Sequence, residues 1–195
     1  MKTSEADILI VPGWSGSGPD HWQSRWERSL KTARRVEQED WRNPDRDAWC
    51  ARIVEAAAQS VRPVVLVGHS LGTIAIAHAG TKLARLPVRP VGAFLVAPAD
   101  VDNASAWPVT DGETFNETAG KGFAPAPVAT LPFPSVLVSS ANDPYCTAAR
   151  AQAMATAWGA AHLPSGDVGH INVASGHGPW PDGLLAFGMF LKRLA

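Results

Sequence analysis

The fold of this chain is decided by the segment Pro63-Val64-Val65-Leu66-Val67-Gly68-His69-Ser70-Leu71-Gly72. Its first half, residues 63–67, is apolar and rich in β-branched side chains, which is typical of a strand buried on both faces. Its second half, residues 68–72, fits the pattern Gly-x-Ser-x-Gly, in which a strand turns sharply into a helix and exposes the serine. The Ala- and Ile-rich residues 73–84 supply that helix. The segment therefore predicts a strand, a strained turn that carries Ser70, and a helix packed closely against a sheet.

The rest of the chain continues this alternation, which predicts a mainly parallel sheet covered on both faces. We expect further strands at residues 7–11, 34–39, 91–96, 135–140 and 160–163, and helices at residues 19–30, 45–60, 148–158 and 184–194. Residues 97–134 are the longest irregular stretch. Because no repeat or linker divides the sequence, we expect one domain over residues 1–195, a three-layer α/β/α sandwich with about six strands.

The composition is that of a folded chain, since 46% of its 195 residues are hydrophobic and 18% are charged. The net charge of −1 argues against a nucleic-acid partner, because displacing counterions needs a cationic surface. No apolar run reaches the roughly 20 residues of a membrane span, and the first residues lack a signal-peptide pattern. The two cysteines, Cys50 and Cys146, are too few for a disulfide framework or a four-ligand zinc site. We expect a soluble cytoplasmic protein with buried cysteines, no metal and no membrane partner.

A serine side chain is a weak nucleophile and needs a base, which in turn needs an orienting acid. In the chain order Ser, Asp, His, Asp143 follows the strand at 135–140, and His170 follows the last strand. Residues after the carboxyl ends of parallel strands meet at one edge of the sheet, where Ser70 is also expected. The sequence thus predicts Ser70 as nucleophile, His170 as base and Asp143 as acid.

Other residues compete for these roles. Asp100 and Asp102 also follow a strand, so either is an alternative acid, whereas Asp167 lies too close to His170 in sequence to orient it easily. His177 shares the last loop and is the alternative base. His69 lies inside the elbow and points away from the serine, and His78 lies on the following helix; both are expected to pack rather than react. His162 is expected in or at the end of the short last strand.

The oxyanion of an acyl-transfer intermediate needs fixed N–H donors. One candidate is the backbone N–H of Leu71, next to the nucleophile. The other is the backbone N–H of Trp14, in the glycine-rich loop at residues 12–18. This loop lacks the Gly-Lys-Ser/Thr ending of a phosphate-binding P-loop, and no acidic residue stands at the spacing of a dinucleotide-binding fold. We therefore expect an oxyanion loop and no nucleotide cofactor, with a simple flexible turn as the plainer alternative.

Four segments together resemble the α/β-hydrolase superfamily: VPGWSGSGPDHWQSRWE at 11–27, VLVGHSLGT at 65–73, FAPAPVATLPFPSVLVSSANDPY at 123–145 and GHINVASGHGPWPDG at 169–183. More narrowly, they resemble the small retinoblastoma-binding-protein-9-like, or YdeN-like, serine hydrolases. The resemblance implies a compact fold without a large cap and a triad of Ser70, Asp143 and His170. It implies esterase or peptidase-like activity. It gives no residue-level reason to expect a retinoblastoma partner.

We therefore expect a serine hydrolase that cleaves a small ester, thioester or amide through an acyl-enzyme, with no cofactor. The alternatives are a protein-interaction module with a little-used triad and an acyltransferase. The expected pocket residues are His21, Trp22, His69, Trp107 and Phe115. The chain has eight tryptophans and only one tyrosine. Five of the tryptophans lie near the predicted site in sequence and are candidates for the pocket wall: Trp14, Trp22, Trp26, Trp107 and Trp180.

Overall fold

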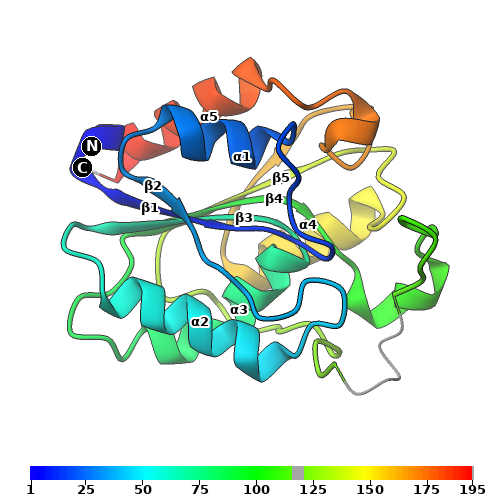
Figure 1. Ribbon diagram of the computed structural model, residues 1–195, viewed down its shortest axis with the longest axis horizontal. Coiled ribbons are helices and arrows are strands. Elements are labelled where there is room, and N and C mark those ends of the chain that lie inside the picture. The colour runs from blue at the N-terminus through cyan, green and yellow to red at the C-terminus, as the bar shows by residue number, and fades with distance from the viewer. Residues whose placement is uncertain (116–120, 195) are drawn as a thin grey trace.

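Figure 1 shows the computed structural model, which describes residues 1–115 and 121–194; residues 116–120, within the irregular stretch expected at 97–134, lie outside it. A six-stranded sheet forms the centre in the order β2-β1-β3-β4-β5-β6, and all neighbouring strands are parallel. The strands are β1 (Asp7–Val11), β2 (Ala33–Arg35), β3 (Val64–Ser70), β4 (Gly92–Pro98), β5 (Ser135–Ser139) and β6 (Ala161–Pro164). The predicted α/β/α architecture is confirmed.

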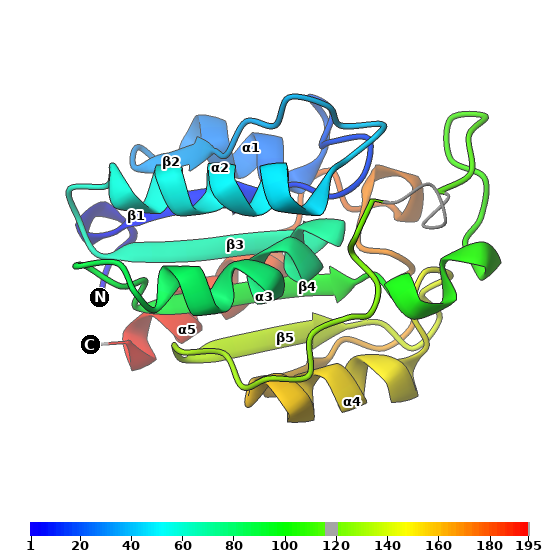
Figure 2. The same cartoon turned by 90° about the horizontal axis from the view of Figure 1, so that it is seen from below.

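Helices cover both faces of the sheet (Figures 1 and 2). Helices α1 and α5 lie on one face, and α2, α3 and α4 lie on the other. The helices are α1 (Trp22–Ser29), α2 (Arg46–Ala58), α3 (Leu71–Leu83), α4 (Ala148–Trp158) and α5 (Pro181–Arg193). Short 3₁₀ helices are η1 (Thr3–Glu5), η2 (Val101–Ala106) and η4 (Val173–Ser175). Within the described residues no separate cap domain covers the sheet, as expected.

The strands are apolar because a hydrophobic core lies on each face of the sheet. On β1, Ile8 and Ile10 pack with α1 and α5, whereas Leu9 and Val11 pack with α2 and α3. Because side chains alternate between the faces of a strand, a strand that is covered on both faces must be apolar throughout. The same holds for β3, β4 and β5, all of whose residues are buried.

The strand order reverses between β1 and β3, because the chain adds β2 on one side of β1 and β3 to β6 on the other. Ligands of open parallel sheets bind beyond the carboxyl ends of the strands at such a switch point. Here Val11, the last residue of β1, is paired with Gly68 of β3. The glycine-rich loop after β1 and the turn after β3 therefore start side by side.

Several boundaries differ from the predictions. Strand β2 is shorter than the strand expected at 34–39. Val36, the next residue, still donates its backbone N–H to the carbonyl of Ile10 on β1 and packs in the core on the side of α2 and α3. The predicted strand ends at residue 67 and the turn after it carries Ser70, whereas strand β3 continues to Ser70, so the serine is its last residue. Helix α5 begins at Pro181, earlier than expected, since proline is well suited to the first turn of a helix.

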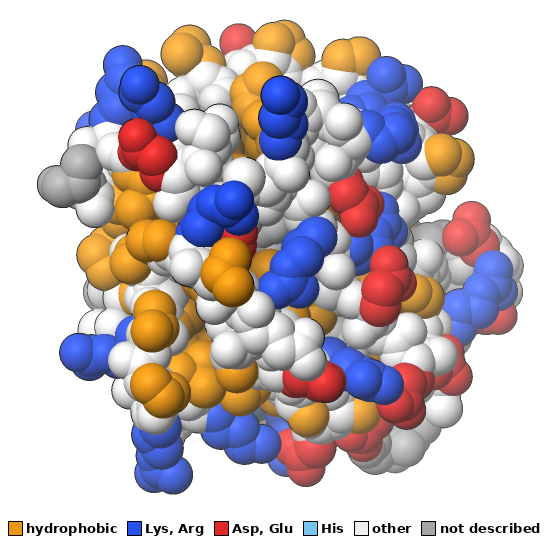
Figure 3. All heavy atoms as spheres, turned by 60° about the vertical axis from the view of Figure 1, so that its left-hand side comes forward, with side chains coloured by type: hydrophobic (Ala, Val, Ile, Leu, Met, Phe, Trp, Pro, Cys, Tyr) orange, Lys and Arg blue, Asp and Glu red, His pale blue; other side chains and the backbone are white. Residues whose placement is uncertain are grey.

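Charged side chains of both signs are interspersed across the face of the molecule shown in Figure 3, with hydrophobic side chains gathered toward one side. That face therefore offers no broad surface of a single sign. Among the described residues, no helix combines the length and the apolar character needed to cross a membrane.

Candidate active site

Ser70 stands in a strained backbone conformation between β3 and α3. Its φ is 54° and its ψ is −126°, a region that non-glycine residues rarely occupy. Two glycines make the tight turn possible. A Cβ on Gly72 would overlap the carbonyl oxygen of Val11, and a Cβ on Gly68 would lie 2.8 Å from Cδ1 of Ile76. The chain thus uses glycine where helix α3 meets the end of β1, and the hydroxyl of Ser70 faces the carboxyl edge of the sheet.

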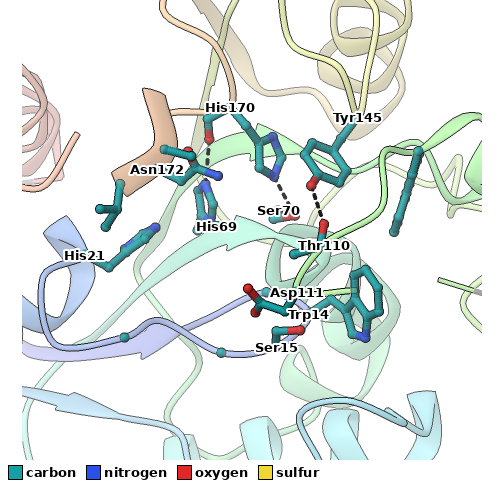
Figure 4. Close-up of a pocket in the computed structure, with 16 residues that line it drawn as sticks. Trp14, Ser15, His21, His69, Ser70, Thr110, Asp111, Tyr145, His170 and Asn172 are labelled. Atoms are coloured by element: carbon teal, nitrogen blue, oxygen red, sulfur yellow. Dashed lines mark hydrogen bonds between the residues drawn. The ribbon is translucent and has the colours of Figure 1, made fainter. Parts of the chain in front are cut away.

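Three buried side chains form a continuous hydrogen-bonded chain at this edge. His170 Nε2 lies 2.8 Å from Ser70 Oγ (Figure 4), and His170 Nδ1 lies 2.9 Å from both carboxylate oxygens of Asp143. A carboxylate can only accept, so Nδ1 carries the proton and Nε2 is free to accept from the serine hydroxyl. The structure thus brings together the three residues that the sequence predicts as nucleophile, base and acid.

Loop contacts fix the acid and the base relative to each other. The backbone N–H of Tyr145 donates to Asp143 Oδ1 over 2.9 Å, and the backbone N–H of Gly169 donates to Asn142 Oδ1 over 2.7 Å. The second bond ties the loop after β5 directly to the loop that carries His170. The residues on either side of His170 have positive φ, 61° at Gly169 and 47° at Ile171, so the histidine projects from a sharply turned segment.

The competing acids and base are engaged elsewhere. Arg150 forms ion pairs with both Asp100, at 3.0 Å, and Asp102. The ring of His177 contacts Ser175 Oγ at 3.2 Å. His78 and His162 also lie away from the serine. The ring of His78 contacts the carbonyl of Phe123, and the ring of His162 contacts the hydroxyl of Ser139.

The two expected oxyanion donors lie on backbone that adjoins the serine. Leu71 is the first residue of α3, so its N–H has no acceptor within the helix. A Cβ built on Gly13 would lie 2.7 Å from Ser70 Cβ and 3.2 Å from Leu71 N, which shows how closely the glycine-rich loop passes the elbow. Trp14, the next residue, lines the pocket at this point. The loop is held by a hydrogen bond from Ser15 N to the carbonyl of Trp41, 2.9 Å long.

A fully buried glutamine, which the sequence analysis did not single out, supports the same loop. Gln23 Nε2 donates to the carbonyl oxygens of Val11 and Val67, and Gln23 Oε1 accepts from the hydroxyl of Ser17. It therefore joins the ends of β1 and β3 to the far side of the glycine-rich loop. Its position in the DHWQ segment was the only sequence signal for this role.

Ser70 opens into a cavity of about 360 Å³. Of the expected pocket residues, His21, His69 and Trp107 line it, as does Trp14. Trp22 and Phe115 do not line it, which corrects the expectation for both. The cavity is also lined by residues that were not expected: Ser15, Thr110, Asp111, Tyr145, Asn172, Val173 and Ala174.

The two expected aromatic residues that do not line the cavity pack behind its walls. Trp22 is fully buried and donates its indole N–H to the carbonyl of Ile171 over 2.9 Å, so it supports the His170 loop from behind. Phe115 packs edge-on against Trp14, with ring centroids 5.4 Å apart, and against Trp107 at 4.7 Å. A large apolar ring gains more from such packing than from facing a cavity open to water.

Comparison with known proteins assigns the chain to a family. A model described as serine hydrolase matches residues 8–188. The chain belongs to the serine hydrolase family. It is similar, at 30% identity and a TM-score of 0.81, to the crystal structure of a YdeN-like hydrolase from Pectobacterium atrosepticum, over 98% of this chain and 94% of that one. The predicted resemblance to YdeN-like hydrolases is confirmed.

Two more distant structures share the fold. The ydeN gene product of Bacillus subtilis has 17% identity and a TM-score of 0.67, over 96% of this chain and 99% of that one. Esterase 2 of Thermogutta terrifontis has 13% identity and a TM-score of 0.66, over 100% of this chain and 86% of that one. At these identities the likeness concerns the fold alone. No curated protein matches the sequence of this serine hydrolase.

Two histidines near Ser70 and His170 in this serine hydrolase are held neutral. Burial, and then the neighbouring His170, lower the pKa of His21 to about 3. Burial, and then His21, lower the pKa of His69 well below its ordinary value. His21 Nδ1 accepts from the backbone N–H of Gln23, so its proton is on Nε2. Both rings therefore offer hydrogen bonds to the pocket without charge.

The cysteines of this serine hydrolase are poorly suited to reaction or metal binding. Burial raises the pKa of Cys50 to about 11 and that of Cys146 to about 12, which keeps both as thiols rather than thiolates. In residues 1–115 and 121–194, no three His, Cys, Asp or Glu side chains are grouped so as to hold a metal ion.

Proposed function

We propose that this serine hydrolase cleaves small carboxylic esters and thioesters, with Ser70 as nucleophile, His170 as general base and acid, and Asp143 as the orienting acid. The single observation that carries this proposal is the unbroken hydrogen-bonded chain from Asp143 through His170 to Ser70, on a serine held at φ 54°. An ordinary strand-to-helix corner has no need of a strained serine in line with a buried histidine and aspartate.

The geometry supports a two-step reaction. As Ser70 Oγ attacks the substrate carbonyl, His170 Nε2 takes the hydroxyl proton, and the Asp143 carboxylate stabilises the imidazolium. The oxyanion accepts hydrogen bonds from the N–H groups of Leu71 and Trp14. His170 then donates its proton to the leaving oxygen or sulfur, which yields the acyl-enzyme. Water attacks the acyl group with the same base, and Ser70 is released.

The pocket supports a small-molecule acyl substrate. A cavity of about 360 Å³ lies at the small end of ligand pockets, and no cap domain among the described residues encloses a long chain. Its walls combine the indole rings of Trp14 and Trp107 with the neutral imidazoles of His21 and His69. This mixture suits a short, partly apolar acyl group with a few hydrogen-bond acceptors.

The proposal is tested by steady-state hydrolysis of para-nitrophenyl esters and of acyl thioesters, each with acyl chains of graded length. We expect the wild type to cleave short chains faster than long ones. The Ser70→Ala and Asp143→Asn variants should lose turnover by roughly a thousand-fold or more while keeping their unfolding midpoints. Full turnover by Ser70→Ala, or none by folded wild type on any ester or thioester, would overturn the proposal.

A further inference from the structure

The pocket has two chemically different sides (Figure 4). His21 and Asn172 lie on one side of Ser70, whereas Trp14, Thr110 and Asp111 lie on the other. Among the described residues that line the pocket, Asp111 is the only Asp, Glu, Lys or Arg. One side therefore carries a carboxylate beside aromatic rings, and the other carries neutral hydrogen-bonding groups.

A tight turn holds Asp111 in place. Thr110 N donates to the carbonyl of Glu113 over 2.8 Å, and Glu113 N donates to the carbonyl of Thr110 over 3.0 Å. Asp111 and Gly112 between them have φ of 53° and 79°, the combination of a two-residue hairpin turn. The other end of the turn is fixed by an ion pair between Glu113 and Arg42 at 2.8 Å.

The same turn is tied directly to the triad. Thr110 Oγ1 and the Tyr145 hydroxyl are 2.6 Å apart, and the Tyr145 ring lies against the His170 ring with centroids 4.1 Å apart. The backbone N–H of Tyr145 also donates to Asp143. The position of Asp111 relative to Ser70 is thus set by a short series of contacts rather than by a free loop.

Among the pocket-lining residues that the structure describes, no Lys or Arg offsets this carboxylate. His21 and His69 are neutral, because burial lowers the pKa of each. The nearby cations are engaged elsewhere: Arg42 pairs with Glu113, and Lys121 Nζ binds Asn43 Oδ1. Trp14, Trp107 and Tyr145 also line the pocket, and the face of an aromatic ring attracts a positive charge as a carboxylate does.

We propose that Asp111, together with the Trp14, Trp107 and Tyr145 rings, forms a subsite for a positively charged group, so that the substrates of this enzyme are esters or thioesters that carry an ammonium group. The inference rests on the proposed function for the bond that is cleaved. It adds a substrate class that the triad itself does not define.

The test compares esters that differ only in charge. One pair is the para-nitrophenyl esters of trimethylammoniobutyrate and of its isostere in which a tert-butyl group replaces the trimethylammonium group. A second pair, butyrylcholine and 3,3-dimethylbutyl butyrate, places the cation on the alcohol. We expect wild type to favour the cationic member of at least one pair by roughly three- to ten-fold in kcat/KM. This preference should shrink at high salt, because the subsite is open to solvent.

The decisive variant is Asp111→Asn, which keeps the size of the side chain and removes its charge. We expect it to lose most of the preference for the cationic ester. The control is Glu55→Gln on helix α2, which removes an exposed carboxylate that is paired with Arg52 and does not line the pocket, and which should keep the preference. Equal rates for both members of both pairs in wild type, or an unchanged preference in Asp111→Asn, would overturn the subsite.

A binding measurement separates this proposal from the proposed function. Methyl ketones with the same trimethylammonium-propyl and tert-butyl-propyl groups are titrated calorimetrically into wild type and Asp111→Asn, which requires no turnover. If no ester is cleaved but the cationic ketone binds more tightly to wild type than to Asp111→Asn, the hydrolase proposal fails and the subsite stands. If esters are cleaved without any cationic preference, and the two ketones bind equally, the subsite fails and the hydrolase stands.

Discussion

The imidazole of His69 donates a hydrogen bond from Nε2 to the backbone carbonyl oxygen of His170, 2.9 Å away. The residue that precedes the serine in the elbow thus holds the backbone of the base, and the two rings lie 4.9 Å apart. The sequence predicts that His69 points away from the serine and packs. In the structure its ring instead lines the pocket beside His170, and its contact positions the loop that carries His170.

This relationship predicts a loss of turnover in His69→Phe, which keeps a ring of similar size and removes the donor. Leaving the buried carbonyl of His170 without a donor costs about 1–3 kcal/mol. We expect the His170 loop to shift in response, which displaces the base and reduces kcat roughly ten-fold. His69→Gln can still donate and should retain more of kcat. The control is His162→Phe on the edge strand β6, which should keep kcat. Equal kcat for His69→Phe and wild type would contradict the positioning role.

The close approach of the glycine-rich loop to the elbow predicts that Gly13→Ala is inactive or nearly so. The added Cβ would stand 2.7 Å from Ser70 Cβ and must displace the backbone that carries the Trp14 N–H. Losing one oxyanion donor costs about a hundred-fold or more in kcat. The same substitution at Gly188, on helix α5, meets no atom within 4 Å and should leave kcat unchanged. Wild-type kcat in Gly13→Ala would exclude Trp14 as a donor.

The low pKa of His21 predicts a stability that falls in acid. Its pKa is about 3 in the folded chain and near the ordinary 6.5 in the unfolded chain, so between these values only the unfolded chain binds the proton. The free energy of unfolding should therefore decrease by up to about 1.4 kcal/mol per pH unit as the pH falls below 6.5 on account of this residue.

The measurement is urea unfolding at several pH values between 7 and about 4, within this titration window. His21→Asn retains a side chain that can accept from the Gln23 N–H at the start of α1 but does not titrate. We expect its unfolding free energy to depend less steeply on pH than that of wild type. A slope as steep as the wild-type slope would show that His21 is not held neutral.

Most of the fold was predictable because it follows from local patterns. The apolar runs in β1, β3, β4 and β5 match strands buried on both faces, and the glycine pattern around Ser70 matches its strained turn. The expected triad residues also come together, because each lies at or beyond the carboxyl end of a strand and parallel strands end at the same edge.

The pocket walls were harder to predict, because they depend on contacts between distant loops. Thr110 and Asp111 reach the pocket through a turn whose position depends on Tyr145 and Arg42, and no local pattern indicates either contact. Of the five tryptophans expected near the site, Trp14 and Trp107 line the cavity. The remaining three pack against one another between α1 and α5, behind the pocket: Trp22, Trp26 and Trp180.

The most direct test of the central claim is labelling by a fluorophosphonate, followed by intact-mass and peptide mass spectrometry. Such a probe reacts with a serine only when a base activates it and an oxyanion site accepts the phosphoryl oxygen. We predict one adduct per chain, located on Ser70, and none in a folded Ser70→Ala variant. A folded wild-type protein that takes up no label, or takes it up equally in Ser70→Ala, would contradict the account.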